Sequence, residues 1–136
     1  AQMEQIKADH RIVMLHHPLY SVRRESNNLI QRWMFNDIIC DAKADLVLQG
    51  HEHGYAHCTA EEEPLKGHDC TNPPLYVISH CSPKEYHLHP TKRFYPVIQG
   101  SRYYQIIDVD AKAVTYKAYD VANDALIDSV RITKSK

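Results

Sequence analysis

The residues of this chain that could do chemistry are histidines placed directly after apolar runs. His51 and His53 lie two residues apart just past one apolar run, and His16 lies just past another. Histidine is the commonest metal ligand, and neutral imidazole suits zinc, iron and related transition metals. These three side chains therefore form a candidate metal site, to which several segments of the chain would contribute.

Predicted strands must position these histidines. The runs 11–15 and 46–48 are apolar over strand length, as expected of strands covered on both faces. Pro18 should stop the first strand, because proline cannot donate to a sheet ladder. A helix is predicted between the two strands, since apolar residues recur there three or four apart and make one stripe: Leu29, Ile30, Trp33, Met34, Ile38 and Ala42. Strand, helix and strand in this order form half of a doubly wound unit, whose ligands tend to lie at the strand ends.

The rest of the chain predicts further β structure. A third strand is expected over 75–79, after a loop over 57–74 and before an irregular segment over 83–100. The tail reads as an antiparallel meander because its residues alternate between apolar and polar, and its strands are expected over 103–109, 114–119 and 126–132.

Composition excludes some classes of partner. The chain has 136 residues, 43% of them hydrophobic and 24% charged, which suits one globular domain of ordinary size. The net charge is -1, and the interspersed charges form no basic stripe, so no nucleic-acid partner is expected. No apolar stretch approaches the roughly 18 residues of a membrane span, and no signal peptide is visible.

The cysteines leave two alternatives open. Cys58 and Cys70 flank a polar loop and could close it as a disulfide in an oxidising compartment. Cys40 falls in the predicted helix and is expected to be a small buried apolar group. A structural zinc site is the second alternative, built from histidine and cysteine neighbours: His57 with Cys58, His68 with Cys70, and His80 with Cys81. The compartment stays open, with an extracytoplasmic (periplasmic or secreted) location favoured.

Two segments together resemble a known enzyme family. Val13-Met14-Leu15-His16 runs into Pro18-Leu19-Tyr20, and Gly50-His51-Glu52-His53 is followed by Tyr55. This pattern resembles the second half of a calcineurin-like metallophosphoesterase, and purple acid phosphatases have the most similar pattern. The resemblance implies an α+β fold, namely the C-terminal half of a four-layer α/β/β/α sandwich that ends in an antiparallel meander. Residues 1–136 would then be the C-terminal part of a single catalytic domain.

The resemblance also implies an activity, the metal-dependent hydrolysis of a phosphate ester by a phosphatase or phosphodiesterase. His16 and His51 would ligate one metal ion and His53 a second, the two ions being iron, zinc or manganese. Such a pair of ions activates a water for attack on phosphorus in line with the leaving group.

Further candidate residues lie in the loop after the first strand and after the second histidine pair. His17, Arg23 and Arg24 are catalytic candidates, since the arginine fork matches phosphate geometry. Substrate contacts are expected from three other side chains, those of Asn27, Tyr20 and Tyr55.

The first three motifs of the family are absent from the chain. They read D-x-H or D-x-G, then G-D-x-x-D or G-D-x-x-Y, then G-N-H-D or G-N-H-E, and they supply the remaining ligands. We therefore expect the missing N-terminal half to be a partner, and the fragment alone to be inactive and to self-associate through uncovered strand edges. The alternatives are a non-catalytic fragment or interaction module with the same fold, or a Cys/His zinc-stabilised binding domain.

Overall fold

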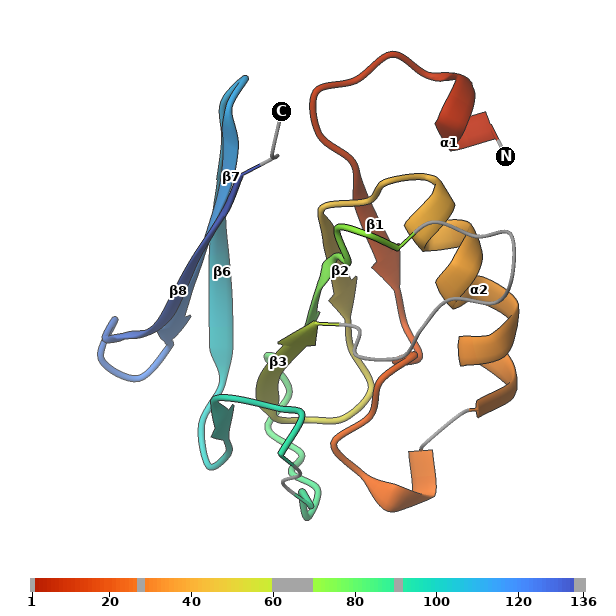
Figure 1. Ribbon diagram of the computed structural model, residues 1–136. Helices are drawn as coiled ribbons and strands as arrows, with labels where there is room; N and C mark the ends of the chain where they lie inside the picture. Colours follow the sequence, from red (N-terminus) through yellow and green to blue (C-terminus); the bar gives the residue numbers. More distant parts are fainter. Residues whose placement is uncertain (1, 27–28, 60–69, 90–91, 134–136) are drawn as a thin grey trace.

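Three layers make up the described part of the molecule (Figure 1). The computed structural model describes most of the chain, over residues 2–26, 29–59, 70–89 and 92–133. Helix α2 (Leu29–Asp41) covers one face of a five-stranded sheet, and a three-stranded sheet covers the other face. The described residues do not form a second long helix, so the helical fourth layer expected of a complete sandwich is not among them.

The five-stranded sheet has the order β1-β2-β4-β3-β5. Three of its strands are parallel and correspond to the predicted apolar runs: β1 (Ile12–Leu15), β2 (Leu46–Gln49) and β4 (Leu75–Ile78). Because α2 connects β1 to its parallel neighbour β2, the predicted strand–helix–strand unit is confirmed. Two very short helices, α1 (Gln2–Gln5) and η1 (Arg24–Ser26), lie before α2.

Two antiparallel strands of this sheet were not predicted. β3 (Tyr55–Thr59) extends into the expected loop 57–74, and β5 (Val97–Ile98) lies in the segment 83–100 that was expected to be irregular. Both are short, and β3 forms through pairing with β4 and β5 rather than through a local apolar pattern. Distant pairing thus decides the conformation of these two segments.

The antiparallel meander of the tail is confirmed. It consists of β6 (Tyr103–Val109), β7 (Ala113–Asp120) and β8 (Leu126–Thr133) in sequential order. One buried cluster joins this sheet to the larger one and contains residues of both: Leu46, Tyr55, Leu75, Val77, Tyr103, Val114, Tyr116 and Ala118. A second cluster fills the space between the larger sheet and the helix with its neighbouring loops.

The strand β1 is covered less than predicted. Ile12 is 39% exposed and Met14 is 77% exposed, whereas Val13 and Leu15 pack against the core beneath α2. The reason is topological, because β1 is the terminal strand of its sheet and pairs only with β2.

Helix α2 turns its polar side toward the protein. Arg32 and Asp37 are each 7% exposed, while Trp33 is 68% exposed. The predicted apolar stripe therefore faces outward, with Ala42, just past the helix end, as its one buried member. Sequence periodicity places these residues correctly on one face but cannot say which face is buried.

Asn36 explains part of this orientation. Its side-chain oxygen accepts hydrogen bonds from the hydroxyl groups of Tyr20 at 3.0 Å and Tyr76 at 2.9 Å. Both tyrosines are fully buried, and buried hydroxyl groups require partners. A polar helix face thus satisfies the polar groups of the core beneath it.

The disulfide joins Cys40 to Cys70, so the predicted pairing of Cys58 with Cys70 is wrong. Cys58 is free and buried, Cys81 is free and exposed, and Cys40 is a disulfide partner rather than an isolated apolar group. This pairing also removes the Cys70 thiolate from the alternative zinc site. A disulfide suits an oxidising setting such as the extracellular space. No helix in the described ranges has the length and apolar character of a membrane span.

Candidate metal centre

The site is built at the ends of two neighbouring parallel strands. Leu15 pairs with Gln49 in the register of β1 and β2, so the residues that follow both strands emerge side by side. The Gly50 amide then donates a hydrogen bond to the carbonyl oxygen of His16 at 3.1 Å. Parallel strands thus bring together two segments that lie far apart in the sequence.

Three histidines converge at this edge of the sheet. One ring nitrogen from each of His16, His17 and His51 lies within 4.8 Å of the other two. The ring centroids are 4.4 Å apart for His17 and His51, and 5.4 Å apart for His16 and His51. Within the described ranges this is the one group of three or more histidine, cysteine, aspartate or glutamate side chains that lie close enough together to hold a metal ion. Imidazole nitrogens gathered in this way could hold a metal ion.

His53 lies outside this cluster. Its Nδ1 is 2.7 Å from the carbonyl oxygen of Lys84, and its ring stacks on His80 with centroids 5.4 Å apart. A carbonyl oxygen only accepts, so Nδ1 carries the proton and Nε2 of the neutral ring keeps its lone pair. Metal-bound histidines commonly donate their second ring nitrogen to a carbonyl in this way. The hydrogen bond therefore leaves Nε2 as the ring nitrogen of His53 that could bind a ligand.

Buried polar contacts hold the turn between β2 and β3 in place. Glu52 is fully buried, and its Oε2 accepts a hydrogen bond from the hydroxyl of Ser21 at 2.7 Å. The side-chain oxygen of Gln49 accepts another from the amide of Leu19 at 2.8 Å. These two bonds tie the turn after β2 to the loop after β1, which sets the spacing of the histidines.

The conformational demand of the turn falls on histidines rather than on glycine. Gly50 has no positive φ angle, and the positive φ angles of the turn belong to His51, at 70°, and His53, at 53°. Non-glycine residues adopt this region uncommonly and often near functional sites. The His51 ring lies against His16 and His17, whereas the His53 ring lies against His80.

Electrostatics favour the neutral, ligating form of His51. Burial lowers the pKa of His51, and the positive charges that His17, His16 and Arg23 can carry lower it further. Burial raises the pKa of the Glu52 carboxyl, against the opposing effect of its bond from Ser21. A neutral imidazole with a free lone pair is the form that binds a metal ion.

The loop after β1 places the candidate catalytic residues unevenly. His17 belongs to the histidine cluster, and Arg23 is half-buried with its guanidinium 4.0 Å from the ring centre of Tyr86. Arg24 is exposed, and Asn27 lies outside the described residues. The catalytic roles of these side chains remain predictions.

The two tyrosines predicted to contact substrate are fully buried. The Tyr20 hydroxyl donates to Asn36 at 3.0 Å, and the Tyr55 hydroxyl donates to Asp128 at 2.6 Å. Both hydroxyl groups thus bond to protein partners, and the substrate contacts expected of these two tyrosines stay predictions.

His80, predicted from the sequence only as part of the alternative zinc site with Cys81, lies beside His53 and is a further candidate. It lies two residues after the end of β4, so the pattern of histidines near strand ends could have identified it. Burial lowers the pKa of His80, and neighbouring His53 lowers it further. Its ring also makes an edge contact with Tyr103, at a centroid distance of 5.8 Å.

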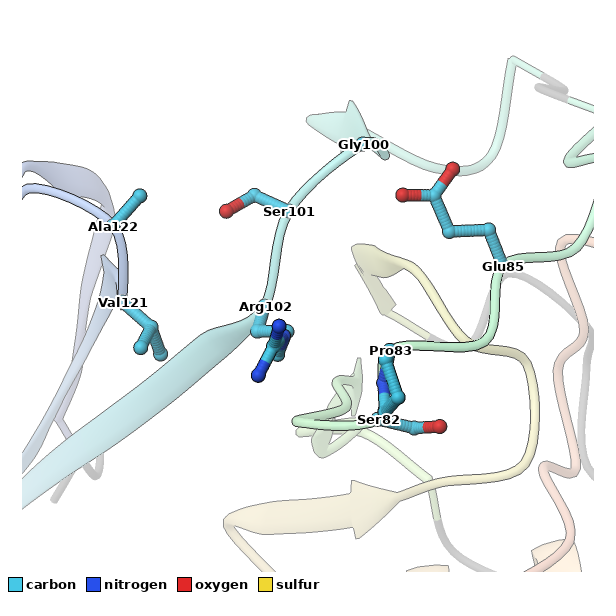
Figure 2. Close-up of a pocket in the computed structure, with 8 residues that line it drawn as sticks. All are labelled: Ser82, Pro83, Glu85, Gly100, Ser101, Arg102, Val121 and Ala122. Atoms are coloured by element: carbon cyan, nitrogen blue, oxygen red, sulfur yellow. The ribbon is translucent and has the colours of Figure 1, made fainter.

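A polar cavity opens beside the segment around Lys84, whose carbonyl oxygen is the hydrogen-bond partner of His53. It has a volume of about 350 Å³ and is lined by Ser82, Pro83, Glu85, Gly100, Ser101, Arg102, Val121 and Ala122. Figure 2 shows Glu85 and Arg102 on different segments of its wall. A guanidinium, a carboxylate and two hydroxyl groups suit a small polar group better than an apolar one.

Two solved structures share this fold, although no family model and no curated protein sequence matches the chain. One is GAP50, the anchor in the inner membrane complex of Plasmodium, with a TM-score of 0.73 and 14% identity over 99% of this chain and 40% of that one. The other is purple acid phosphatase PPD1 from yellow lupin (Lupinus luteus) seeds, with a TM-score of 0.67 and 15% identity. The alignment covers 96% of this chain and 26% of the phosphatase chain.

The described residues have part of a purple acid phosphatase-like fold. Identities this low establish the fold alone. The chain spans less than half the length of either structure. The histidine cluster is compatible with a metallophosphoesterase-like fold and makes the use of metal plausible.

Proposed function

We propose that this chain supplies the histidine side of a dinuclear metal centre that hydrolyses a phosphate ester. The observation that carries the proposal is the convergence of His16, His17 and His51, whose ring nitrogens lie within 4.8 Å of one another. The cluster sits on a purple acid phosphatase-like fold, at the strand ends where such sheets bind ligands.

Each histidine has a role in this proposal. His16 and His51 hold one metal ion and His53 holds the second through Nε2, with iron, zinc or manganese as the pair. Two bound cations would neutralise charge on the phosphoryl oxygens and lower the pKa of a water. His17, 4.4 Å from His51 between ring centroids, either completes the first ligand set or donates a proton to the leaving group.

Arg23 is the candidate for holding the phosphate group. Its guanidinium stacks on Tyr86 and lowers the pKa of His51, so its charge reaches the cluster. A planar guanidinium can bind two phosphoryl oxygens at once. Arg24 is exposed and would contact only a larger substrate.

In this proposal the remaining metal ligands come from polypeptide beyond these 136 residues. Three or four histidines leave coordination positions open, and the chain aligns with 26% of the purple acid phosphatase structure. We propose that an N-terminal half of the domain, in the same or another polypeptide, is the partner. The 136 residues alone should bind metal weakly and turn over little phosphate ester.

Metal titration tests the ligand assignment directly. Zinc binding to the chain would be measured by competition with a chromogenic chelator, for the wild type and for His16→Ala, His51→Ala and His53→Ala. Loss of a ligand in the first two variants should weaken the tighter site by at least 10-fold, by analogy with the 10–100-fold cost of losing even an outer-shell partner. His87→Ala, in an exposed loop, is the control and should change nothing.

Hydrolysis of p-nitrophenyl phosphate then tests the reaction. The assay uses the longest natural polypeptide that contains these residues, and His16→Ala or His51→Ala should abolish its activity. Full activity and full metal affinity in both variants would disprove the assignment.

A non-catalytic anchoring or interaction module is the second candidate. It is favoured by GAP50, an anchor protein that aligns with 99% of the chain at a TM-score of 0.73. In that case the natural polypeptide would hydrolyse no phosphate ester, and alanine substitutions in the histidine cluster would leave its partner binding unchanged. An extracytoplasmic location, periplasmic or secreted, is proposed for either function because the Cys40–Cys70 disulfide needs an oxidising compartment.

A further inference from the structure

The outward side of helix α2 is an extended apolar surface, which we name the α2 outer face. Its side chains are between 41% and 71% exposed and number six: Leu29, Ile30, Trp33, Met34, Phe35 and Ile38. The charged residues within the helix do not interrupt it, since Arg32 and Asp37 are buried and Asp41 lies half-buried at the end. Water therefore contacts a helix surface that has the composition of a protein core.

The area of this face exceeds that of an ordinary monomer patch. With roughly 200 Å² for each large apolar side chain, the exposed fractions leave on the order of 700 Å² of apolar surface. The largest patch on a typical monomer covers about 300–600 Å². Two such faces pressed together would bury about 1,400 Å², which lies inside the roughly 1,200–2,000 Å² of stable specific interfaces.

We propose that a second copy of this chain covers the α2 outer face, with the two α2 helices packed against each other across a two-fold axis. A two-fold interface uses the same patch on both copies, so one apolar helix face suffices. The 13 residues of α2 extend about 20 Å, enough for several turns of side-chain interdigitation. No exposed charge within the helix opposes the contact.

Other occupants fit the surface less well. Helices that lie on membranes carry lysine and arginine along their polar side, but α2 contains no lysine and its one arginine is buried. The polypeptide that completes the metal centre must approach the strand ends beside His16 and His51. Figure 1 shows α2 against the sheet, and the outer face lies on the opposite side of the helix from that contact. The dimer is therefore independent of the proposed phosphoesterase function.

Sedimentation velocity over about 1–100 µM protein tests the proposal, together with acrylamide quenching of Trp33, the only tryptophan in the chain. We expect a monomer–dimer equilibrium in which quenching of Trp33 falls as the dimer forms. Ile38→Glu should weaken the dimer at least 30-fold, because it would bury a charge in an apolar interface. Glutamate is a good helix former, so this exposed substitution should leave the fold intact.

Ile106→Glu is the matched control. Ile106 is 45% exposed and Ile38 is 47% exposed, but Ile106 lies on β6 in the other sheet. The control should dimerise like the wild type. Met34→Lys, which adds the opposite charge to the α2 outer face, should act like Ile38→Glu, and far-UV circular dichroism would verify that all variants are folded.

Several results would overturn the proposal. One is a monomer at every concentration, whether Trp33 is freely quenched or is already shielded within one chain. Another is equal weakening of the dimer by Ile38→Glu and Ile106→Glu, which would place the contact elsewhere. A third is protection of Trp33 by phosphatidylcholine–phosphatidylserine vesicles without any dimer, which would assign the face to a lipid surface.

Discussion

The carboxylate of Asp128 joins the two sheets, and its replacement by alanine should destabilise the protein by about 2–3 kcal/mol. Its Oδ2 accepts a hydrogen bond from the Tyr55 hydroxyl at 2.6 Å and lies 3.6 Å from Nε2 of His57. Tyr55 begins β3, directly after the histidine turn, while Asp128 lies on β8 of the other sheet. The contact therefore anchors the start of β3, next to the histidine turn, to the other sheet.

The magnitude follows from burial. Hydrogen bonds to charged groups contribute roughly 1.5–3 kcal/mol, and Tyr55 is fully buried, so Asp128→Ala would remove the charged acceptor of its buried hydroxyl. For 136 residues, an unfolding entropy of about 2.1 cal/mol/K per residue converts 2 kcal/mol into a Tm lower by about 7 °C. Tyr55→Phe should cost less, because it removes the buried hydroxyl itself.

Urea unfolding followed by far-UV circular dichroism would measure these free energies. Together with the double variant they form a cycle, in which we expect a coupling of about 1–2 kcal/mol between Tyr55 and Asp128. Asp108→Ala is the control, because Asp108 pairs with Lys117 at 3.6 Å on the surface and should change stability by under about 0.5 kcal/mol. Equal effects of Asp128→Ala and Asp108→Ala, or a coupling near zero, would refute the reasoning.

Two further predictions concern stability. Cys40→Ser should lower the free energy of unfolding by roughly 3–4 kcal/mol, because the Cys40–Cys70 bond closes a loop of 30 residues. Cys81→Ser, the control at an exposed free cysteine, should change the free energy of unfolding by less than about 0.5 kcal/mol. Similar urea midpoints for the two variants would contradict the pairing. Burial lowers the pKa of His57 below 6.5 despite the opposing charge of Asp128, so the unfolded chain binds more protons than the folded one as pH falls past 6.5. Stability should therefore decrease from pH 7.5 to pH 5.5 in urea titrations, less steeply in His57→Gln, and an unchanged slope in that variant would argue against a buried neutral His57.

The sequence alone determined the local structure and the residues at the strand ends. The runs around Val13, Val47 and Val77 are short and apolar, which indicates strands, and Pro18 limits how far the first of them can extend. Histidines directly after such strands meet at one sheet edge when the strands are parallel neighbours, as β1 and β2 are. This reasoning requires only periodicity and chain geometry, which are readable from neighbouring residues.

Only the tertiary structure decided which partners meet across the chain. It grouped His17 with His16 and His51, turned His53 toward Lys84, and paired Cys70 with Cys40. The direction of a side chain depends on its backbone dihedral angles, and the positive φ values at His51 and His53 carry no local sequence signal. The outward orientation of the apolar side of α2 has the same origin. The buried hydroxyl groups of Tyr20 and Tyr76 require Asn36 as a hydrogen-bond partner, and only the packing of distant segments brings these three residues together.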